Sequence, residues 1–294
     1  MAISIEAREY TYADIREVLR QMREAYPSLK QTAIGKSVMG REITALTLGG
    51  DAEYVLYAGA FHGMERLTCT LLLQFAAELA EMQKAGKDLG LPAGRGIILV
   101  PLVNPDGCEI ALRGAPGCGC SAARICRLCA GDYRVWNANA RGVDINHNFD
   151  AGWKQLQKLE QAAGIYGPSP TRYGGPRPES EPETIALTTL CRAQPIRQVL
   201  AIHSQGEVIY WDYGRSTPAR SRAMAEALSK ASGYALEEPE AIASMGGFKD
   251  WFIEEFGRPG FTVEIGRGVN PLPPADLPGI YQKVRRMLFL AALL

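Results

Sequence analysis

Continuous apolar runs that alternate with helical patterns constrain the fold of this chain more than any other feature. Residues 96–104 (GIILVPLVN) and 198–203 (QVLAIH) hold apolar side chains at consecutive positions, as strands buried on both faces do. Elsewhere, residues 11–25 and 65–84 repeat apolar side chains at helical spacing. Strands that alternate with helices predict an α/β fold with a mostly parallel or mixed sheet that is covered on both faces.

The charge balance excludes several classes of protein. The 294 residues include 32 basic and 32 acidic side chains, whereas binding to nucleic acid by counterion release needs a basic face. The longest apolar stretches, around residues 71–73 and 287–294, are too short to span a bilayer. Seven cysteines, an odd number, and a charged N-terminal stretch predict a cytoplasmic protein. We therefore expect no nucleic-acid or membrane partner, and the pattern leaves the oligomeric state open.

A histidine and a glutamate three residues apart follow the β-type run YVLYAGA. His62 and Glu65 lie in the sequence AFHGMERL, at the start of the next helical pattern. Imidazole nitrogen and carboxylate oxygen are zinc ligands, and a strand-to-helix turn can direct both at one point. The pair has a second interpretation, a surface histidine beside a glutamate that the helix dipole favours.

Two further side chains stand at or near strand ends. His203 closes the run QVLAIH, and open α/β sheets place ligand sites at the carboxyl ends of their strands. Glu264 lies in the apolar run FTVEIG, where a carboxylate needs a structural partner or a catalytic task. Together, His62, Glu65 and His203 would form a zinc site with one position open for water. Glu264 would then be the general base that takes a proton from this water.

The order of these motifs resembles the zinc carboxypeptidases of the carboxypeptidase A type. The likeness covers nearly the whole chain and rests on IGKSVMGREITALTLG, HGME, VPLVNPDG, RGVDINHNF, SEPET, GGFKDWF and FTVEIG, in the family order. The resemblance implies one zinc peptidase catalytic domain over residues 1–294, a single-domain α/β/α globule with a mixed, mostly parallel eight-stranded sheet. It also implies Zn²⁺ as the cofactor and a small peptide as the substrate, cleaved at an amide bond.

The resemblance gives roles to individual residues. His62, Glu65 and His203 match the zinc ligands of the family, and Glu264 matches its general base. Arg141, just before the sequence GVD, is the best match to the arginine that stabilises the oxyanion. A fixed cation beside developing negative charge is usually a large catalytic contribution.

The loop RGVDINHNF and the last motifs indicate how the substrate is held. By resemblance, Asp144 supports a ligand histidine and Asn146 binds the terminal carboxylate of the substrate. Relatives have arginine at the position of His147, and histidine cannot grip a carboxylate with a bidentate fork. Lys249 falls at the floor of the family's specificity pocket, where an ammonium suits an acidic group, and Arg267 is a further candidate carboxylate partner.

These departures favour a narrower prediction within the family. The motif GRGVNPLP and the absence of arginine at position 147 resemble bacterial γ-D-glutamyl-diamino acid peptidases. These enzymes cut the γ-D-glutamyl–meso-diaminopimelate bond of cell-wall peptides. The alternatives are a conventional metallocarboxypeptidase that releases C-terminal residues, an amidohydrolase-like deacylase, and a non-catalytic peptide-binding relative. The family's substrate-capping tyrosine has no counterpart at Ile242, although Tyr210 or Tyr213 can approach from another strand.

A cysteine-rich segment is inserted between the family motifs, as a loop at about residues 113–131. It contains the sequence CGCSAARICRLC, with Cys118, Cys120, Cys126 and Cys129. Thiolates favour tetrahedral zinc, so a second, structural ion is one interpretation. One or two disulfides, or free thiols in a loop, are the others.

Overall fold

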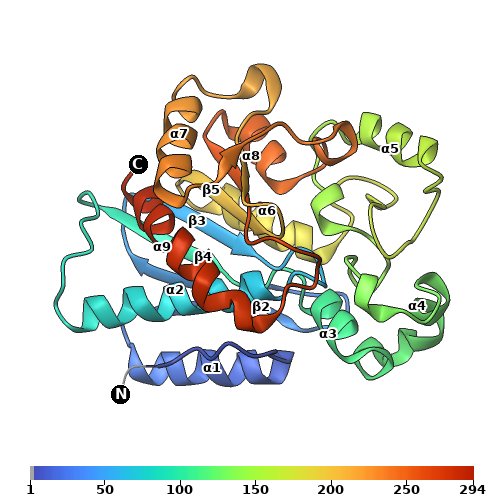
Figure 1. Cartoon of the computed structure of the whole chain (residues 1–294), viewed down its shortest axis with the longest axis horizontal. Coiled ribbons are helices and arrows are strands. Elements are labelled where there is room, and N and C mark those ends of the chain that lie inside the picture. The colour runs from blue at the N-terminus through green and yellow to red at the C-terminus, as the bar shows by residue number, and fades with distance from the viewer. Residues whose placement is uncertain (1–2) are drawn as a thin grey trace.

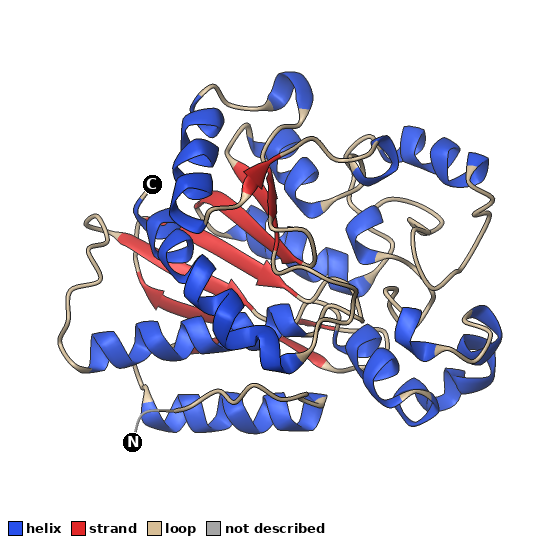
Figure 2. Cartoon of the chain, in the orientation of Figure 1, coloured by secondary structure: helices blue, strands red, loops and turns tan. Residues whose placement is uncertain are grey.

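An eight-stranded sheet runs through the centre of the computed structural model, which describes residues 3–294 (Figures 1 and 2). The strand order is β1-β2-β4-β3-β5-β8-β6-β7. The pairs β3–β4, β3–β5, β5–β8 and β6–β7 are parallel, whereas β1–β2, β2–β4 and β6–β8 are antiparallel. The predicted mixed, mostly parallel sheet is therefore confirmed. The strands are β1 (Lys30–Lys36), β2 (Glu42–Gly49), β3 (Glu53–Gly59), β4 (Arg95–Val100), β5 (Ile196–His203), β6 (Val208–Tyr210), β7 (Ala235–Leu236) and β8 (Gly260–Glu264).

Helices cover both faces of the sheet. The helices α1, α2, α7 and α9 pack on one face, where Figure 1 shows α2 and α9 crossing in front of the strands. The helices α6 and α8 contribute to the core on the other face. Within residues 3–294, no helix has the length and apolar character needed to cross a membrane. The bounds are α1 (Tyr12–Ala25), α2 (Leu67–Lys84), α3 (Pro105–Arg113), α4 (Ala122–Leu128), α5 (Trp153–Ala162), α6 (Pro182–Ala193), α7 (Arg220–Ser232), α8 (Phe248–Phe256) and α9 (Leu277–Leu293).

The continuous apolar runs serve two cores at once. In β3, Val55 and Tyr57 belong to the core beneath α2 and α9, whereas Leu56 and Ala58 belong to the core beneath α6 and α8. Successive side chains of a strand point to opposite faces, so a strand covered on both sides has to be apolar at every position. β4 and β5 divide their side chains between the two cores in the same way.

The cysteine-rich segment is helical, so the prediction of a loop there is wrong. α3 begins at Pro105 after Asn104, whose side chain accepts a hydrogen bond from the Gly107 N–H and caps the helix. A 3₁₀ helix (Ala115–Ser121) and α4 then fold back on α3 around a small apolar core. That core contains Ile110, Cys118, Ile125, Cys129 and Trp136, and its burial stabilises the short helices.

Candidate active site

Three adjacent parallel strands carry the predicted ligands and base to one edge of the sheet. β3 ends at Gly59, three residues before His62. His203 is the last residue of β5, and Glu264 is the last residue of β8. His203 and Glu264 are also register partners across the β5–β8 pair. The carboxyl ends of these strands therefore bring the four side chains together, as the strand-end rule for α/β sheets predicts.

His62, Glu65 and His203 form one compact cluster. The Nδ1 atom of His62 lies 2.8 Å from Glu65 Oε1, and the Nδ1 atom of His203 lies 3.0 Å from Glu65 Oε2. The two Nδ1 atoms are 3.3 Å apart. One ligand atom of each residue lies within 4.8 Å of the others, an arrangement found at no other group of acidic, histidine or cysteine side chains in residues 3–294. Two imidazole nitrogens and a carboxylate that converge in this way are a zinc donor set.

A carboxylate stands behind the cluster and orients one of its histidines. Asp144 Oδ1 lies 3.1 Å from His62 Nε2, and Asp144 Oδ2 accepts a hydrogen bond of 2.8 Å from the Arg172 N–H. Burial raises the pKa of Asp144, but the positive charge of His62 and His147 outweighs it and lowers the pKa well below the ordinary value. Asp144 is therefore placed as a charged partner of a candidate ligand, as carboxylates behind metal-binding histidines usually are.

Glu65 and Glu264 have opposite electrostatic environments. Burial raises the pKa of Glu65, but the charges of His62 and His203 lower it to about 2. Burial also raises the pKa of Glu264, and the nearby Glu65 carboxylate raises it further. The cluster thus contains one carboxylate that is held charged and one that readily accepts a proton, which is the division expected between a ligand and a general base.

A cavity of about 400 Å³ opens at the strand ends beside this cluster. His62, Glu65, His203 and Glu264 line it. The remaining predicted site residues that the structure brings to the cavity are Asp144, Asn146, His147 and Lys249.

Two predicted residues do not line the cavity. The side chain of Arg141 is 51% exposed, and its guanidinium lies 3.5 Å from the Glu181 carboxylate. The side chain of Arg267 is 76% exposed and pairs with Glu207 at 2.9 Å. The guanidinium of Arg141 thus lies beside the buried Glu181 carboxylate rather than at the cavity, and its role at the oxyanion stays a prediction.

The structure adds cavity residues that the sequence did not single out. They include Arg172, Glu240 and Asp250, while Tyr210, one of two tyrosines considered for the substrate cap, also lines the cavity. Arg172 has a left-handed backbone with a φ of 66°, uncommon for a residue other than glycine. Its carbonyl oxygen lies 3.1 Å from His147 Nδ1, so its backbone contacts both the Asp144 and His147 side chains. No local motif could have marked it, because its place depends on these long-range contacts.

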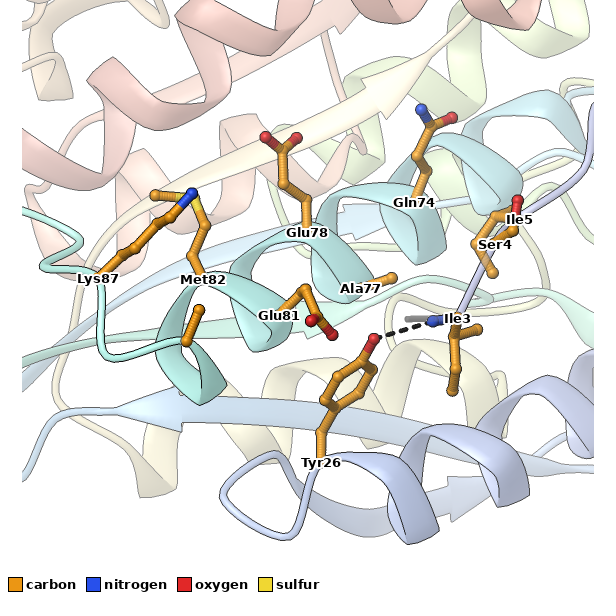
Figure 3. Close-up of a pocket in the computed structure, with 11 residues that line it drawn as sticks. Ile3, Ser4, Ile5, Tyr26, Gln74, Ala77, Glu78, Glu81, Met82 and Lys87 are labelled. Carbon is orange, nitrogen blue, oxygen red and sulfur yellow. Dashed lines mark hydrogen bonds between the residues drawn. The ribbon is translucent and has the colours of Figure 1, made fainter. Parts of the chain in front are cut away.

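A second depression lies between the N-terminal segment and α2 (Figure 3). It has a volume of about 550 Å³ and is lined in part by Ile3, Tyr26 and Glu81. The Tyr26 hydroxyl accepts a hydrogen bond of 3.0 Å from the Ile3 N–H there. Because it shares no lining residue with the cavity at the strand ends, it is separate from the chemistry described above.

The cysteine-rich segment gives no support to a second, structural ion. All of its cysteines are free thiols, and within residues 3–294 no three of them gather their sulfur atoms as metal ligands would. Cys118 and Cys129 are buried in the small core, whereas Cys126 is half-buried and Cys120 is exposed. Free thiols are thus the alternative that the geometry favours.

The fold and the cluster define a zinc metallopeptidase. The chain matches the family model of zinc carboxypeptidases over residues 15–286 and therefore belongs to that family. It is 36% identical to the γ-D-glutamyl-L-diamino acid endopeptidase 1 of Lysinibacillus sphaericus, over 97% of this chain and 72% of that protein. Its fold is similar to that of bovine thrombin-activatable fibrinolysis inhibitor, with a TM-score of 0.79, 20% identity and 98% of each chain covered. The murein-tripeptide amidase of Escherichia coli O157 is another fold neighbour, with a TM-score of 0.57 and 23% identity over 94% of this chain and 96% of that one.

Proposed function

We propose that this zinc peptidase hydrolyses the amide bond between γ-D-glutamate and meso-diaminopimelate in cell-wall peptides. The 36% identical relative is named for γ-D-glutamyl-L-diamino acid hydrolysis, which supports the same bond type here. The observation that carries the proposal is the polar lining beside the metal cluster, where His147 and Lys249 both face the cavity. A substrate with several charged groups needs polar contacts spread around its pocket rather than one bidentate fork.

His62, Glu65 and His203 are the proposed zinc ligands, with Asp144 holding His62 in orientation. One catalytic zinc ion bound there supplies Lewis-acid chemistry, polarising a carbonyl group and lowering the pKa of water. Glu264 takes the proton from the attacking water and passes it to the nitrogen of the leaving diamino acid. Its pKa, which burial and the nearby Glu65 carboxylate raise above the ordinary value, suits this task, because a stronger base takes the proton of water more readily.

We also propose that residues 1–294 form one catalytic domain that acts in the cytoplasm. The observation in favour of this compartment is that all seven cysteines are free thiols, as a reducing environment keeps them.

The test is a competition between two peptides at equal concentration, L-Ala-γ-D-Glu-meso-diaminopimelate and an ordinary peptide with a free C-terminus. The zinc-loaded enzyme should release meso-diaminopimelate faster than it releases the C-terminal residue of the ordinary peptide, as measured by chromatography of the products. Faster turnover of the ordinary peptide would overturn the proposed bond. A Glu264→Gln enzyme run in parallel shows whether either product comes from a contaminating peptidase.

A further inference from the structure

One side-chain amide at the active-site cavity has no hydrogen-bond partner in the protein. Asn137 lines the cavity together with His62 and Glu264, whereas Arg141 does not. The Asn137 side chain makes no hydrogen bond to any residue within 3–294, and its Oδ1 atom is buried. Buried polar groups are nearly always paired, so this amide keeps hydrogen-bonding capacity that a bound ligand can use.

The backbone of Asn137 is fixed beside the metal cluster. Its carbonyl oxygen accepts a hydrogen bond of 3.0 Å from the N–H of Gly63, the residue after His62. The fully buried Asn104 side chain donates to the same oxygen at 3.1 Å and to the Phe61 carbonyl oxygen at 2.9 Å. Asn104 therefore ties the segment of Asn137 to the turn that carries a candidate zinc ligand.

Close packing holds the same turn in place. A Cβ atom at Gly63 would lie 2.5 Å from the Trp136 carbonyl oxygen, so only glycine lets the two segments approach this closely. The Asn137 N–H donates to the Pro170 carbonyl oxygen at 2.9 Å. With both of its backbone groups paired and Oδ1 buried, the side-chain nitrogen of Asn137 is the polar atom that remains for a ligand in the cavity.

A fixed amide donor suits the charge that develops in amide hydrolysis. When water adds to the scissile carbonyl carbon, the π electron pair of the C=O bond moves onto its oxygen, and Glu264 takes one proton of the water. The oxyanion returns that pair as the C–N bond breaks, and Glu264 delivers the proton to the leaving nitrogen. Donors held in advance at this oxygen, side-chain amides included, stabilise the charge without reorganising.

We propose that Asn137 is a catalytic residue whose side-chain N–H donates a hydrogen bond to the developing oxyanion, the role that the sequence predicts for Arg141. The inference rests on the proposed hydrolysis with Glu264 as base, and not on the identity of the bond that is cleaved. It also accounts for the unpaired amide, because the partner of Asn137 arises only when substrate is bound.

The experiment uses the zinc-loaded enzyme and whichever of the two competing peptides the wild type cleaves faster. Asn137→Ala should lower kcat by about 100- to 1000-fold, the usual loss for one oxyanion donor, and leave KM within about threefold. Its melting temperature and zinc content should match the wild type, because folding loses no hydrogen bond of this side chain. Arg134→Ala is the matched control, an exposed position of the same segment outside the cavity, and should keep the wild-type kcat.

Phosphinate analogues of the two peptides give a readout that does not depend on turnover. Their tetrahedral, negatively charged group mimics the oxyanion, so Asn137→Ala should bind the tighter analogue about 100-fold more weakly in calorimetric titration. In a Glu264→Gln background, which keeps the peptide uncleaved, adding Asn137→Ala should change peptide binding by less than about threefold. A residue that only positions the substrate would weaken both ligands alike.

The outcomes separate this inference from the proposed function. A kcat of Asn137→Ala within about threefold of the wild type, or equal losses in phosphinate and peptide binding, overturns the role of Asn137 and leaves the bond assignment standing. A larger loss of kcat in Arg141→Ala than in Asn137→Ala assigns the oxyanion to Arg141 and overturns it as well. If neither peptide is cleaved, the bond assignment fails, and phosphinate binding alone decides the role of Asn137.

Discussion

Two groups of buried carboxylates lie in this molecule, and they are partnered in opposite ways. At the strand ends, Glu65 and Asp144 face imidazole nitrogens of His62 and His203 at distances of 2.8 to 3.1 Å. The ring nitrogens and the Glu65 oxygens converge on one point. A cation at that point would satisfy several of these groups at once.

The second group lies where the segment after β1 meets α3 and α6. Asp106 and Glu183 are both fully buried, but each oxygen has its own donor. Asp106 accepts hydrogen bonds from the Ser37 hydroxyl, the Met39 N–H and the Arg41 guanidinium, at 2.6 to 2.8 Å. This carboxylate connects segments that are far apart in the sequence.

Glu183 makes long-range hydrogen bonds instead of the local helix cap that its sequence position suggests. Ser180 and Glu183 have the spacing of a capping box, but Glu181 precedes α6 and no side chain caps the helix. Glu183 instead accepts from the Val38 N–H at 3.0 Å and from the Asn139 side-chain amide at 3.1 Å. Burial of a carboxylate is therefore a poor mark of function in this chain, and convergence of several donor atoms on one point is a good one.

The largest effect is expected from changing Glu264, the carboxylate beside the metal cluster at the strand ends, to glutamine. Glutamine keeps the shape but cannot accept the proton, so we expect kcat to fall by about 10²- to 10⁴-fold. Zinc content, measured by atomic absorption, should stay near that of the wild type because the ligands are intact. Loss of zinc together with activity would mean that Glu264 has a structural role, as the carboxylates Asp106 and Glu183 of the second group have.

Changing Asp144 to asparagine should weaken the metal rather than the chemistry. Asparagine keeps the side-chain volume but removes the charge beside His62 Nε2, so we expect zinc affinity to fall by about 10- to 100-fold. Competition with a chelator of known affinity measures this effect. Asp106→Asn is the matched control from the second group, and zinc affinity there should be unchanged. Equal loss in both variants would show that the effect comes through folding.

Glu183 should make stability depend on pH without affecting catalysis. Burial raises its pKa from the ordinary 4.5 to about 7. Because the folded pKa lies above the unfolded one, its contribution to stability is complete below about pH 4.5 and is lost as the pH rises through 7. The free energy of unfolding of Glu183→Gln, relative to that of the wild type, should therefore rise by up to about 3 kcal/mol between pH 4.5 and pH 8. Urea unfolding at the two pH values measures this change, and a constant difference between the proteins would contradict it. The kcat of the variant should match the wild type.

The sequence predicts the first group better than the second for a physical reason. His62, His203 and Glu264 follow or end strands whose apolar patterns are local, so their meeting point follows from the order of parallel strands. Arg141 and Arg172 lie in loops instead, and their side chains are placed by contacts such as that between Arg141 and Glu181, 40 residues apart. The helices of the cysteine-rich segment depend likewise on packing around Trp136. Patterns of period two or 3.6 carry no information on such contacts.

The smallest effect is expected for Arg172, whose charge is unpaired, unlike those of the buried carboxylates. Arg172 lines the cavity and is exposed, and its guanidinium has no ion-pair partner in residues 3–294. Such a charge attracts an anionic peptide before contact, so Arg172→Ala should lower kcat/KM by about two- to fivefold at low salt, and the difference should vanish near 0.5 M salt. Arg177→Ala removes an equal charge from the same exposed loop but outside the cavity, and should change kcat/KM less. A loss in Arg172→Ala that salt does not reduce would instead mean direct, desolvated contact with the substrate. Arg172 would then belong with the converging groups of the metal centre rather than with the surface charges.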